Sequence, residues 1–254
     1  RRRAGCQPRS AGRGRARRGS RLGLHGAGAR RVAHGVVRLI ARRSGRLVPQ
    51  RYDALANGAG AGRDGEAAVA RAQLDRLGVD VHAGIDLTSD TSVAKLATAL
   101  AGRSIDILIN NAGLHRSDSF DNLDWKGMRE QFETNTLAPI RLTHAVAANL
   151  GKGAKVAIVT SRSGSIGDNG SGGNYGYRMS KAAVNMAGVN LAIDLKARGV
   201  AVAILHPGMV NTDMGSPQGI DPALSAERLM ARIDALTLAT TGHCLHAEGQ
   251  PLPW

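Results

Sequence analysis

Three apolar runs constrain the fold of this chain more than any other feature of its sequence. Each run is rich in the aliphatic and β-branched residues typical of strands that are buried on both faces. The runs occupy residues 105–110, 155–160 and 200–208. Helical patterns at 91–100, 125–150 and about 177–198 precede or separate them. Strands that alternate with helices predict right-handed crossovers and a parallel sheet with helices on both faces. We therefore predict an α/β fold with a doubly wound parallel sheet in a single domain.

Further helices and strands follow from the same patterns. The expected helices cover residues 66–77 and 225–237, and the expected strands cover residues 79–87 and 243–246. Gly78 would stop the first of these helices, and Ser225 would cap the second. The long helix at 125–150 is expected to be interrupted at residues 135–139, where the sequence is Asn-Thr-Leu-Ala-Pro.

The positive charge of the chain is concentrated in its first quarter. The net charge is +14 over 254 residues. Residues 1–63 hold 17 arginines, no lysine and one acid, Asp53, and the remainder holds 17 basic and 19 acidic residues. The composition changes abruptly near Asp64–Glu66. We therefore predict an atypical basic segment at residues 1–65 and a globular domain at 66–254.

Three interpretations of the basic segment compete. A basic arm could bind nucleic acid through its phosphates, but Tyr52 is its only aromatic residue and no groove-reading motif is present. An Arg-rich, acid-poor leader resembles an organelle transit peptide, although this segment lacks a clear amphipathic helix. The third interpretation is a stretch translated out of frame from a GC-rich gene. We favour the third because of the abrupt change in composition, and we expect no nucleic-acid partner.

A dinucleotide-binding fold would place its phosphate-binding turn in this same segment. Such a turn needs a strand followed by closely spaced glycines, so that backbone N–H groups and a helix N-terminus can meet the pyrophosphate. Gly19, Gly23, Gly26 and Gly28 are present, but their spacing is irregular and no β-branched strand precedes them. We expect that these glycines do not form a working phosphate loop.

Tyr177 and Lys181 are candidates for a catalytic pair. Residues four apart share one face of a helix, so the phenol and the ammonium can point into one site. A nearby cation favours phenolate and lowers the pKa of a tyrosine from its usual value of about 10. A tyrosine tuned in this way can exchange a proton with an alcohol or carbonyl oxygen near neutral pH. The other polar motifs follow predicted strands, and open parallel sheets bind ligands at those strand ends.

Taken in order, these motifs resemble those of the short-chain dehydrogenase/reductase family. They are Asn110-Asn111-Ala112-Gly113, Asn135, Ser161, Tyr177, Lys181, Pro207-Gly208, Val210 and Thr212. The resemblance covers roughly residues 66–254 and is strongest to the branch that contains the C-signal factor and sniffer-type carbonyl reductases. It implies a Rossmann-type sheet and NAD(P)-dependent hydride transfer between a nicotinamide cofactor and a small carbonyl or alcohol substrate.

The resemblance implies a role for each catalytic candidate. Tyr177 would be the general acid in carbonyl reduction and the general base in alcohol oxidation. Ser161 would hydrogen-bond the substrate oxygen as charge develops on it. Lys181 would lower the pKa of Tyr177 and bind the nicotinamide ribose, and Asn135 would hold a water that links Lys181 to solvent. Hydride would come from the cofactor, because no protein side chain supplies one.

The resemblance also implies a cofactor site along the strand ends. Asp86 would accept a hydrogen bond from the adenine amino group, and the turn at Pro207-Gly208 would wrap the nicotinamide end. The expected cofactor contacts are Asp86, Leu87, Asn110, Ala112, Gly113, Tyr177, Lys181, Pro207, Gly208, Val210 and Thr212. We expect NADP (NADPH) rather than NAD. The residues that would select the 2′-phosphate fall in the basic segment, where Arg42, Arg43, Arg46 and Arg51 cannot be assigned.

Two of the catalytic assignments have nearby competitors. Ser163 and Ser165 compete with Ser161, which we prefer because it directly ends the predicted strand. Tyr175 competes with Tyr177, but it lies six residues before the lysine and therefore on another face of the helix.

Other side chains near the predicted site also have local interpretations. Asp86 could instead cap the loop that follows it, and we expect His206 to be a structural residue at a strand end. The substrate-binding site would be lined by His115–Phe120, by the loop at 162–174 and by the region after Thr212.

The expected function is therefore NADPH-linked reduction of a small carbonyl compound. The alternative is a non-catalytic homologue that keeps these residues but cannot hold a dinucleotide. Cys6 and Cys244 form no metal-ligand or redox spacing, and no apolar run is long enough to span a bilayer. We expect a cytoplasmic protein without a metal site. The small residues at 180–195 either pack in the core or against a second copy, and the resemblance favours a homo-oligomer.

Overall fold

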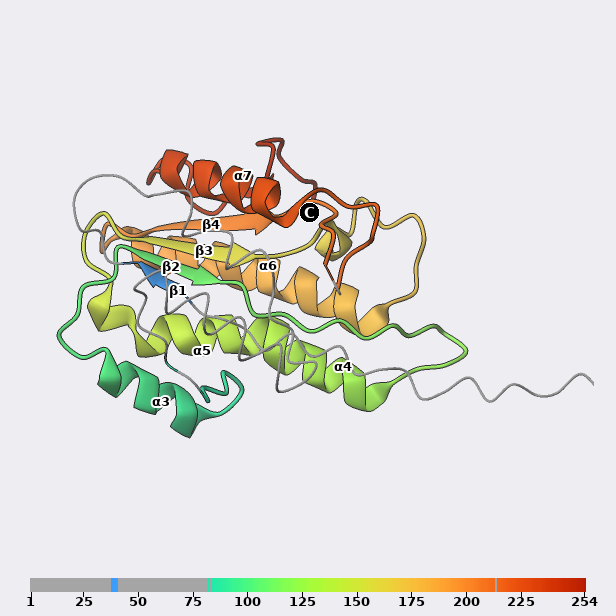
Figure 1. Cartoon of the computed structure of the whole chain (residues 1–254), viewed down its shortest axis with the longest axis horizontal. Helices are drawn as coiled ribbons and strands as arrows, with labels where there is room; N and C mark the ends of the chain where they lie inside the picture. Colours follow the sequence, from blue (N-terminus) through green and yellow to red (C-terminus); the bar gives the residue numbers. More distant parts are fainter. Residues whose placement is uncertain (1–37, 41–81, 83, 213) are drawn as a thin grey trace, which may run out of the picture.

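A five-stranded sheet forms the centre of the structure (Figure 1). The computed structural model describes residues 38–40, 82, 84–212 and 214–254. The strands lie in the order β1-β2-β3-β4-β5, with β2 to β5 parallel and β1 antiparallel to β2. They are β1 (Arg38–Ile40), β2 (Ile107–Asn110), β3 (Lys155–Val159), β4 (Ala201–His206) and β5 (Cys244–His246). The predicted parallel sheet is confirmed for four of these strands.

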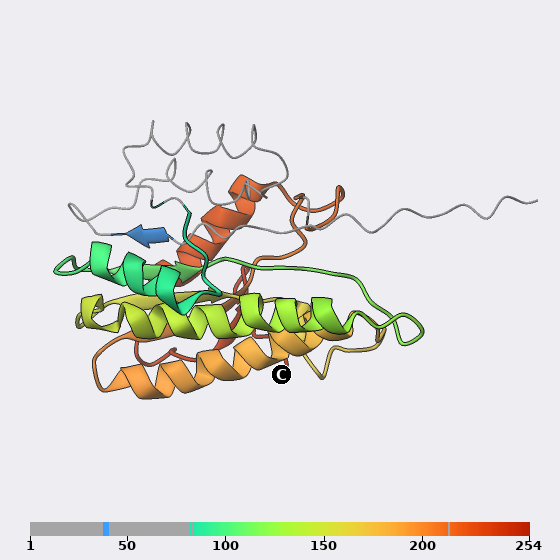
Figure 2. The same cartoon turned by 90° about the horizontal axis from the view of Figure 1, so that it is seen from below.

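Helices cover both faces of the sheet, as predicted. On one face lies α7 (Pro222–Ala235). The other face is covered by α3 (Asp90–Ala99), α4 (Trp125–Phe132), α5 (Ala138–Ala145) and α6 (Tyr175–Lys196). Figure 2 looks onto this second layer, where α3, the continuous α4–α5 segment and α6 lie side by side. Two short 3₁₀ turns, η3 (Ala147–Asn149) and η4 (Arg162–Gly164), follow α5 and β3.

Alternation along the strands gives each face its own core. Leu108, Val156 and Val202 pack in the core beneath α3, α5 and α6. Their strand neighbours Ile107 and Ala203 pack in the core beneath α7. Successive residues of a strand point to opposite faces, and here both faces are buried. The continuous apolar runs of the sequence follow from this two-sided burial.

The edge of the sheet beside β2 differs from the prediction. β1 pairs there in antiparallel register, within a segment where we predicted no strand. The strand predicted over 79–87 is wrong in its described part, because no strand covers residue 82 or residues 84–87. Gly84 has a φ of +71°, and the backbone N–H and hydroxyl of Thr88 both donate to Asp86 Oδ1. Such a side-chain-to-backbone turn competes with strand pairing.

The expected interruption of the long helix is a π-helix, η2 (Glu133–Leu137), between α4 and α5. The backbone N–H of Ala138 donates to the carbonyl of Glu133, which is the wide spacing of a π turn. Pro139 follows in the first turn of α5, where a missing backbone N–H is tolerated. Asn135 lies buried within the π turn.

The predicted cap of the last helix is wrong. Helix α7 begins at Pro222, and Asp221 caps it by accepting from the backbone N–H groups of Ala223 (2.8 Å) and Leu224 (3.4 Å). Proline favours the first position of a helix, so the helix starts three residues earlier than expected. Ser225 lies inside α7, and its hydroxyl donates to the carbonyl of Pro207 at 2.8 Å.

Several predictions lie outside the described residues and stay predictions. They concern the helix at 66–77, the boundary at 65/66, Gly19, Gly23, Gly26, Gly28, Arg42, Arg43, Arg46 and Arg51. Across the part of the chain that the structure describes, no helix is long and apolar enough to cross a membrane. In that same part, no group of three or more His, Cys, Asp or Glu side chains is placed to hold a metal ion.

We expect Gly188→Ala to destabilise the fold by about 1–3 kcal/mol, because a Cβ there overpacks the contact between α6 and β4. That Cβ would lie 2.6 Å from Cγ1 and 2.7 Å from Cδ1 of the buried Ile204. Urea unfolding measures the effect. The matched control is Gly170→Ala, where a Cβ meets nothing within 4 Å, and it should change the free energy of unfolding by less than about 0.5 kcal/mol. Equal effects of the two substitutions would contradict this packing argument.

Candidate active site

Tyr177 and Ser161 meet at the carboxyl edge of the sheet. Tyr177 lies in the first turn of α6, and Ser161 follows β3 as the N-cap of η4. The hydroxyl of Ser161 is hydrogen-bonded to the Tyr177 phenol. Gly164 allows the η4 turn to approach α6, since a Cβ at this position would lie 2.6 Å from the carbonyl carbon of Lys181. The close approach of this turn to α6 thus places the serine beside the tyrosine.

The Lys181 ammonium is buried one helical turn beyond Tyr177. Its side chain donates to the carbonyl of Val159 at 3.0 Å, at the end of β3. Among the described residues this carbonyl is its only hydrogen-bond acceptor. Lys181 Nζ also lies 5.8 Å from the centroid of the Tyr177 ring. An ammonium has three N–H donors, so two remain for a ligand that enters the site.

The predicted direction of the Tyr177 pKa is wrong. Burial raises the pKa of Tyr177, and the hydrogen bond from Ser161 only partly opposes this effect. Burial also lowers the pKa of Lys181 to about 8. Desolvation disfavours the charged form of each group, and the ammonium is directed to the Val159 carbonyl rather than bonded to the phenol. The phenol therefore stays protonated at neutral pH, which is the form that a general acid requires.

Asn135 ties the loop after β2 to α6. Its Oδ1 accepts from the backbone N–H of Leu114 at 2.7 Å. Its Nδ2 donates to the carbonyl of Leu114 at 2.8 Å and to the hydroxyl of Ser180 at 2.9 Å. Both N–H groups of the Asn135 amide are therefore engaged. The π turn that carries this side chain holds the loop against the helix of Tyr177.

His115 lies directly against the candidate acid. Its ring meets the Tyr177 ring edge to face, with centroids 4.6 Å apart and an angle of 72° between the planes. We expected His115 only as part of a substrate lining over residues 115–120. The contact covers one side of the phenol and contributes to its burial.

Three cofactor candidates lie at the end of β2 and in the loop that follows it. Gly113 borders the site, because a Cβ there would lie 3.6 Å from Asn135 Oδ1 and 3.9 Å from Lys181 Nζ. Ala112 is buried in the core beneath α3 and α5. The buried side chain of Asn110 donates to the Thr143 hydroxyl at 3.2 Å, so it faces α5.

The cofactor candidates after β4 form a compact turn. Gly208 has a φ of +87°, and Val210 forms a parallel bridge with Ile220. The hydroxyl and carbonyl of Thr212 both accept from the backbone N–H of Gly215. Pro207 is fixed to α7 through the hydroxyl of Ser225.

Asp86 and Leu87 lie at the turn before α3. Leu87 is buried, and Asp86 is exposed with its Oδ1 bonded to Thr88. The alternative in which Asp86 caps its own loop therefore has a structural basis.

His206 has structural contacts, as we expected. Its ring packs edge to face with that of His246, with centroids 5.2 Å apart. Burial, together with the neighbouring His246, lowers the pKa of His206 to about 4. His206 is therefore neutral at physiological pH.

A buried pair of residues that the sequence patterns did not reveal also supports the site. The hydroxyl of Thr160 donates to Oδ1 of Asn185 at 2.5 Å, and both residues are buried. This contact joins the end of β3 to α6. A signal was present in the sequence, because Asn185 lies four residues after Lys181 and so continues the helix face of the candidate pair Tyr177 and Lys181.

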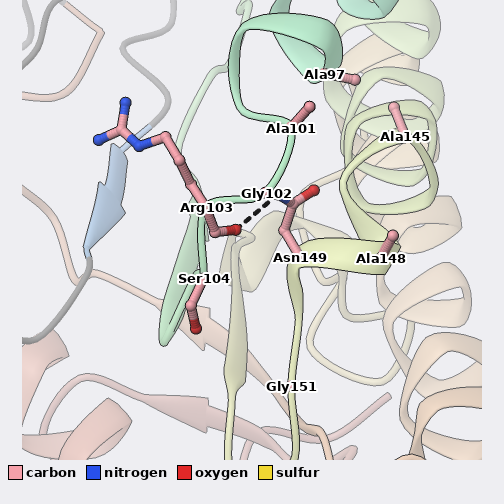
Figure 3. Close-up of a pocket in the computed structure, with 9 residues that line it drawn as sticks. All are labelled: Ala97, Ala101, Gly102, Arg103, Ser104, Ala145, Ala148, Asn149 and Gly151. Carbon is pink, nitrogen blue, oxygen red and sulfur yellow. Dashed lines mark hydrogen bonds between the residues drawn. The ribbon is translucent and has the colours of Figure 1, made fainter.

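A separate hollow lies at the opposite edge of the sheet (Figure 3). It has a volume of about 530 Å³ and includes Arg103 and Ser104 before β2 and Gly151 before β3. The side chain of Asn149 donates to the carbonyls of Leu100 and Arg103, both at 2.7 Å. Because the hollow lies before the strands and the candidate residues lie after them, it is not the site of Tyr177.

The chain matches the short chain dehydrogenase family over residues 54–222. It belongs to this family. This short-chain dehydrogenase is thus an oxidoreductase, and the family resemblance stated from its motifs is confirmed. The match begins within the segment that we predicted to be atypical.

Named relatives of this short-chain dehydrogenase include a bacterial dehydrogenase and C-signal. It is 46% identical over 190 residues to the 1-hydroxy-2-glutathionyl-2-methyl-3-butene dehydrogenase of Rhodococcus sp. (strain AD45), covering 72% of this chain and 84% of that protein. It is 42% identical over 162 residues to C-signal of Myxococcus xanthus, covering 62% of this chain and 98% of that protein.

Solved structures similar to this short-chain dehydrogenase include two carbonyl reductases. The NADPH-bound carbonyl reductase from chicken fatty liver superposes with a TM-score of 0.69 at 28% identity, covering 74% of this chain and 83% of that one. The carbonyl reductase Sniffer of Drosophila melanogaster gives a TM-score of 0.69 at 28% identity, covering 76% and 85%. The Rossmann-like fold is therefore shown.

Replacing Lys181 with Met should stabilise the protein at neutral pH by up to about 3 kcal/mol, because each unit of pKa shift corresponds to about 1.4 kcal/mol. The folded-state pKa of Lys181 is lowered from 10.5 to about 8. The cost of burying the cation is fully present below pH 8, and it disappears as the pH rises to 10.5. Urea unfolding at several pH values measures the difference.

The matched control is Lys196→Met, which removes an exposed lysine from the same helix. It should change the free energy of unfolding by less than about 0.5 kcal/mol at each pH. A destabilised Lys181→Met variant at pH 7 would show that the buried ammonium contributes more through its hydrogen bond than it costs in desolvation.

Proposed function

We propose that this short-chain dehydrogenase reduces the carbonyl group of a small molecule with hydride from NADPH, and that Tyr177 supplies the proton. The observation that carries the proposal is the hydrogen bond from Ser161 to the Tyr177 phenol, with the buried Lys181 ammonium one helical turn away. A substrate oxygen that replaces part of this contact would face a proton donor and a hydroxyl together. That is the arrangement required when negative charge develops on a carbonyl oxygen.

The raised pKa of Tyr177 supports its role as the acid. A protonated phenol can donate to the substrate oxygen as hydride reaches the adjacent carbon, and the hydroxyl of Ser161 stabilises the oxygen in the same step. The bond that breaks is the phenol O–H, and the bond that forms is the alcohol O–H. Alcohol oxidation uses the same residues in reverse, with Tyr177 as the base.

After the reaction, Lys181 and Asn135 would return a proton to the Tyr177 phenol. Because the pKa of Lys181 is about 8, its ammonium can release a proton toward Tyr177 at a small cost. Both N–H groups of the Asn135 amide are engaged, so Asn135 would hold a relaying water only as an acceptor.

The residues present fit the ribose and nicotinamide end of NADPH. No described residue accepts from two of the three donors of the Lys181 ammonium, which are thus available for ribose hydroxyls, and Gly113 borders the same space without a side chain. The cofactor supplies hydride when bound. The preference for NADPH draws support from NADP-bound relatives of known structure, including short-chain dehydrogenases from Burkholderia multivorans and Burkholderia cenocepacia. We propose that the turn from Pro207 to Thr212 closes around the nicotinamide, with Asp86 and Leu87 toward the adenine.

The homo-oligomer expected from the family stays a proposal. Met179, Met186 and Ile193 are exposed along α6 at 51%, 63% and 67%. They follow one another at intervals of seven residues and so share one helix face. A second copy of the chain would cover this apolar face.

We expect Tyr177→Phe to lower kcat for ketone or aldehyde reduction by about 10²–10⁴-fold, the range for loss of a general acid. Binding of NADPH, measured by its fluorescence, should change less than about twofold, because the ring and its contact with His115 remain. Tyr175→Phe is the matched control, since it removes the neighbouring hydroxyl from an exposed side chain, and its kcat should stay at the wild-type level.

Two outcomes would contradict the proposed function in different ways. Full activity of Tyr177→Phe would remove Tyr177 as the acid. Failure of the unaltered protein to bind NADPH at millimolar concentration would favour the alternative of a non-catalytic homologue.

Ser161→Ala should lower kcat by about 10²–10³-fold, the range for removing one donor to a developing oxyanion. Ser163→Ala tests the competing assignment and should leave kcat unchanged, because the contact of Ser163 with Ser161 is made by its backbone N–H. Steady-state kinetics with one aldehyde substrate compares the two variants. A larger loss in Ser163→Ala than in Ser161→Ala would reverse the assignment.

A further inference from the structure

Helix α6, which carries Tyr177 and Lys181, does not cap its own N-terminus. Asn174 occupies the N-cap position in the left-handed region, with φ 48° and ψ 45°, and its side chain makes no capping hydrogen bond. The first amides of a helix lack intrahelical acceptors and need another partner. For α6 that partner comes from a distant loop.

Asp118 supplies the missing cap. Its Oδ1 accepts from the backbone N–H of Tyr175 at 2.5 Å, and its Oδ2 accepts from the backbone N–H of Gly176 at 3.2 Å. Its carbonyl also accepts from the backbone N–H of Asn174 at 2.9 Å. One residue thus binds three consecutive amides that directly precede Tyr177.

The loop that carries Asp118 is anchored to α4 and η2 on its other side. Asn135 holds both the N–H and the carbonyl of Leu114. Gln131, which is fully buried, accepts from the backbone N–H of Arg116 at 2.9 Å. Between these anchors, His115 packs against the Tyr177 ring. The loop therefore contacts α6 at the phenol ring and at the amides before it, while α4 and η2 hold it in place.

We propose that Asp118 is a positioning residue for the reaction. Its carboxylate fixes the first turn of α6 to the anchored loop, so that the Tyr177 phenol keeps its place beside Ser161. Its negative charge also offsets the positive end of the helix dipole near Tyr177. This offset disfavours the phenolate form of Tyr177. This inference rests on the proposed function, because it assigns Asp118 a role only through the proton donor.

The first test is Asp118→Ala. Displacing a catalytic group by about 1 Å can cost about 10²-fold in rate, so we expect kcat to fall about 10–100-fold. NADPH binding measured by fluorescence should change less than about threefold, because the proposed cofactor contacts lie outside this cap. Asp118→Asn keeps one acceptor for Tyr175 N–H and should recover most of kcat.

The matched control is Asp124→Ala. Asp124 also caps a helix by accepting from a backbone amide, that of Gly127 at 2.8 Å, but its helix, α4, carries none of the catalytic candidates. Its thermal unfolding midpoint should fall by about as much as that of Asp118→Ala, with kcat within about twofold of wild type. An equal loss of kcat in both variants would overturn the positioning role.

The pH dependence of Asp118→Asn tests the effect of charge. Reduction needs a protonated Tyr177, so kcat falls as the pH rises through the pKa of this tyrosine. Removing a nearby negative charge favours phenolate, and the alkaline fall should therefore move to lower pH. A cap that serves only stability would leave the profile in place, so an unshifted profile would overturn the electrostatic part of the inference.

Failure of this inference can be told apart from failure of the proposed function. If Tyr177→Phe loses activity while Asp118→Ala retains it, Asp118 does not position the acid and the proposed function still holds. If Tyr177→Phe retains full activity, the proposed function fails first, and the inference about Asp118 fails with it.

Discussion

The burial of the Lys181 ammonium is the constraint on which the rest of the site depends. Removing a cation from water is costly unless it is paired. Here, within the described part of the chain, one carbonyl at the end of β3 accepts from it. The ammonium therefore keeps donors for a ligand and has a pKa low enough to exchange a proton. Both properties follow from the burial of the ammonium, which lowers the stability of the folded protein. Such a trade-off between stability and function is common.

The fold brings the site together by directing successive crossover connections onto α6. The loop after β2 reaches it through His115 and Asp118, and the turn after β3 reaches it through Ser161. In a parallel sheet all of these connections leave the same edge. Helix α6 thus collects contacts from segments that lie up to about 60 residues before it in the chain, and its first turn carries the proposed proton donor. The hollow beside Arg103 and Ser104 lies at the opposite edge, where the strands begin, and not where these connections meet.

Sequence patterns predicted β2, β3 and β4 well, because two-sided burial leaves continuous apolar runs. They failed for residues 84–87, where an Asp86 turn overrides an apolar pattern, and for Ser225, where Pro222 sets the helix start. The order and spacing of the motifs also predicted which side chains would gather around Tyr177. They could not predict the pKa of Tyr177, since spacing reveals a cationic neighbour but says nothing about desolvation.

The sequence by itself determined the family, the parallel sheet and the candidate residues at its carboxyl edge, because these depend on local pattern and on motif order. Only the tertiary structure decided that Tyr177 is held protonated by burial, that Lys181 bonds to Val159, and that a distant carboxylate caps α6. Each of these features arises when separate segments of the chain pack together, because packing excludes water and brings hydrogen-bond partners into contact. No local pattern encodes such contacts, and for that reason they become visible only in the folded chain.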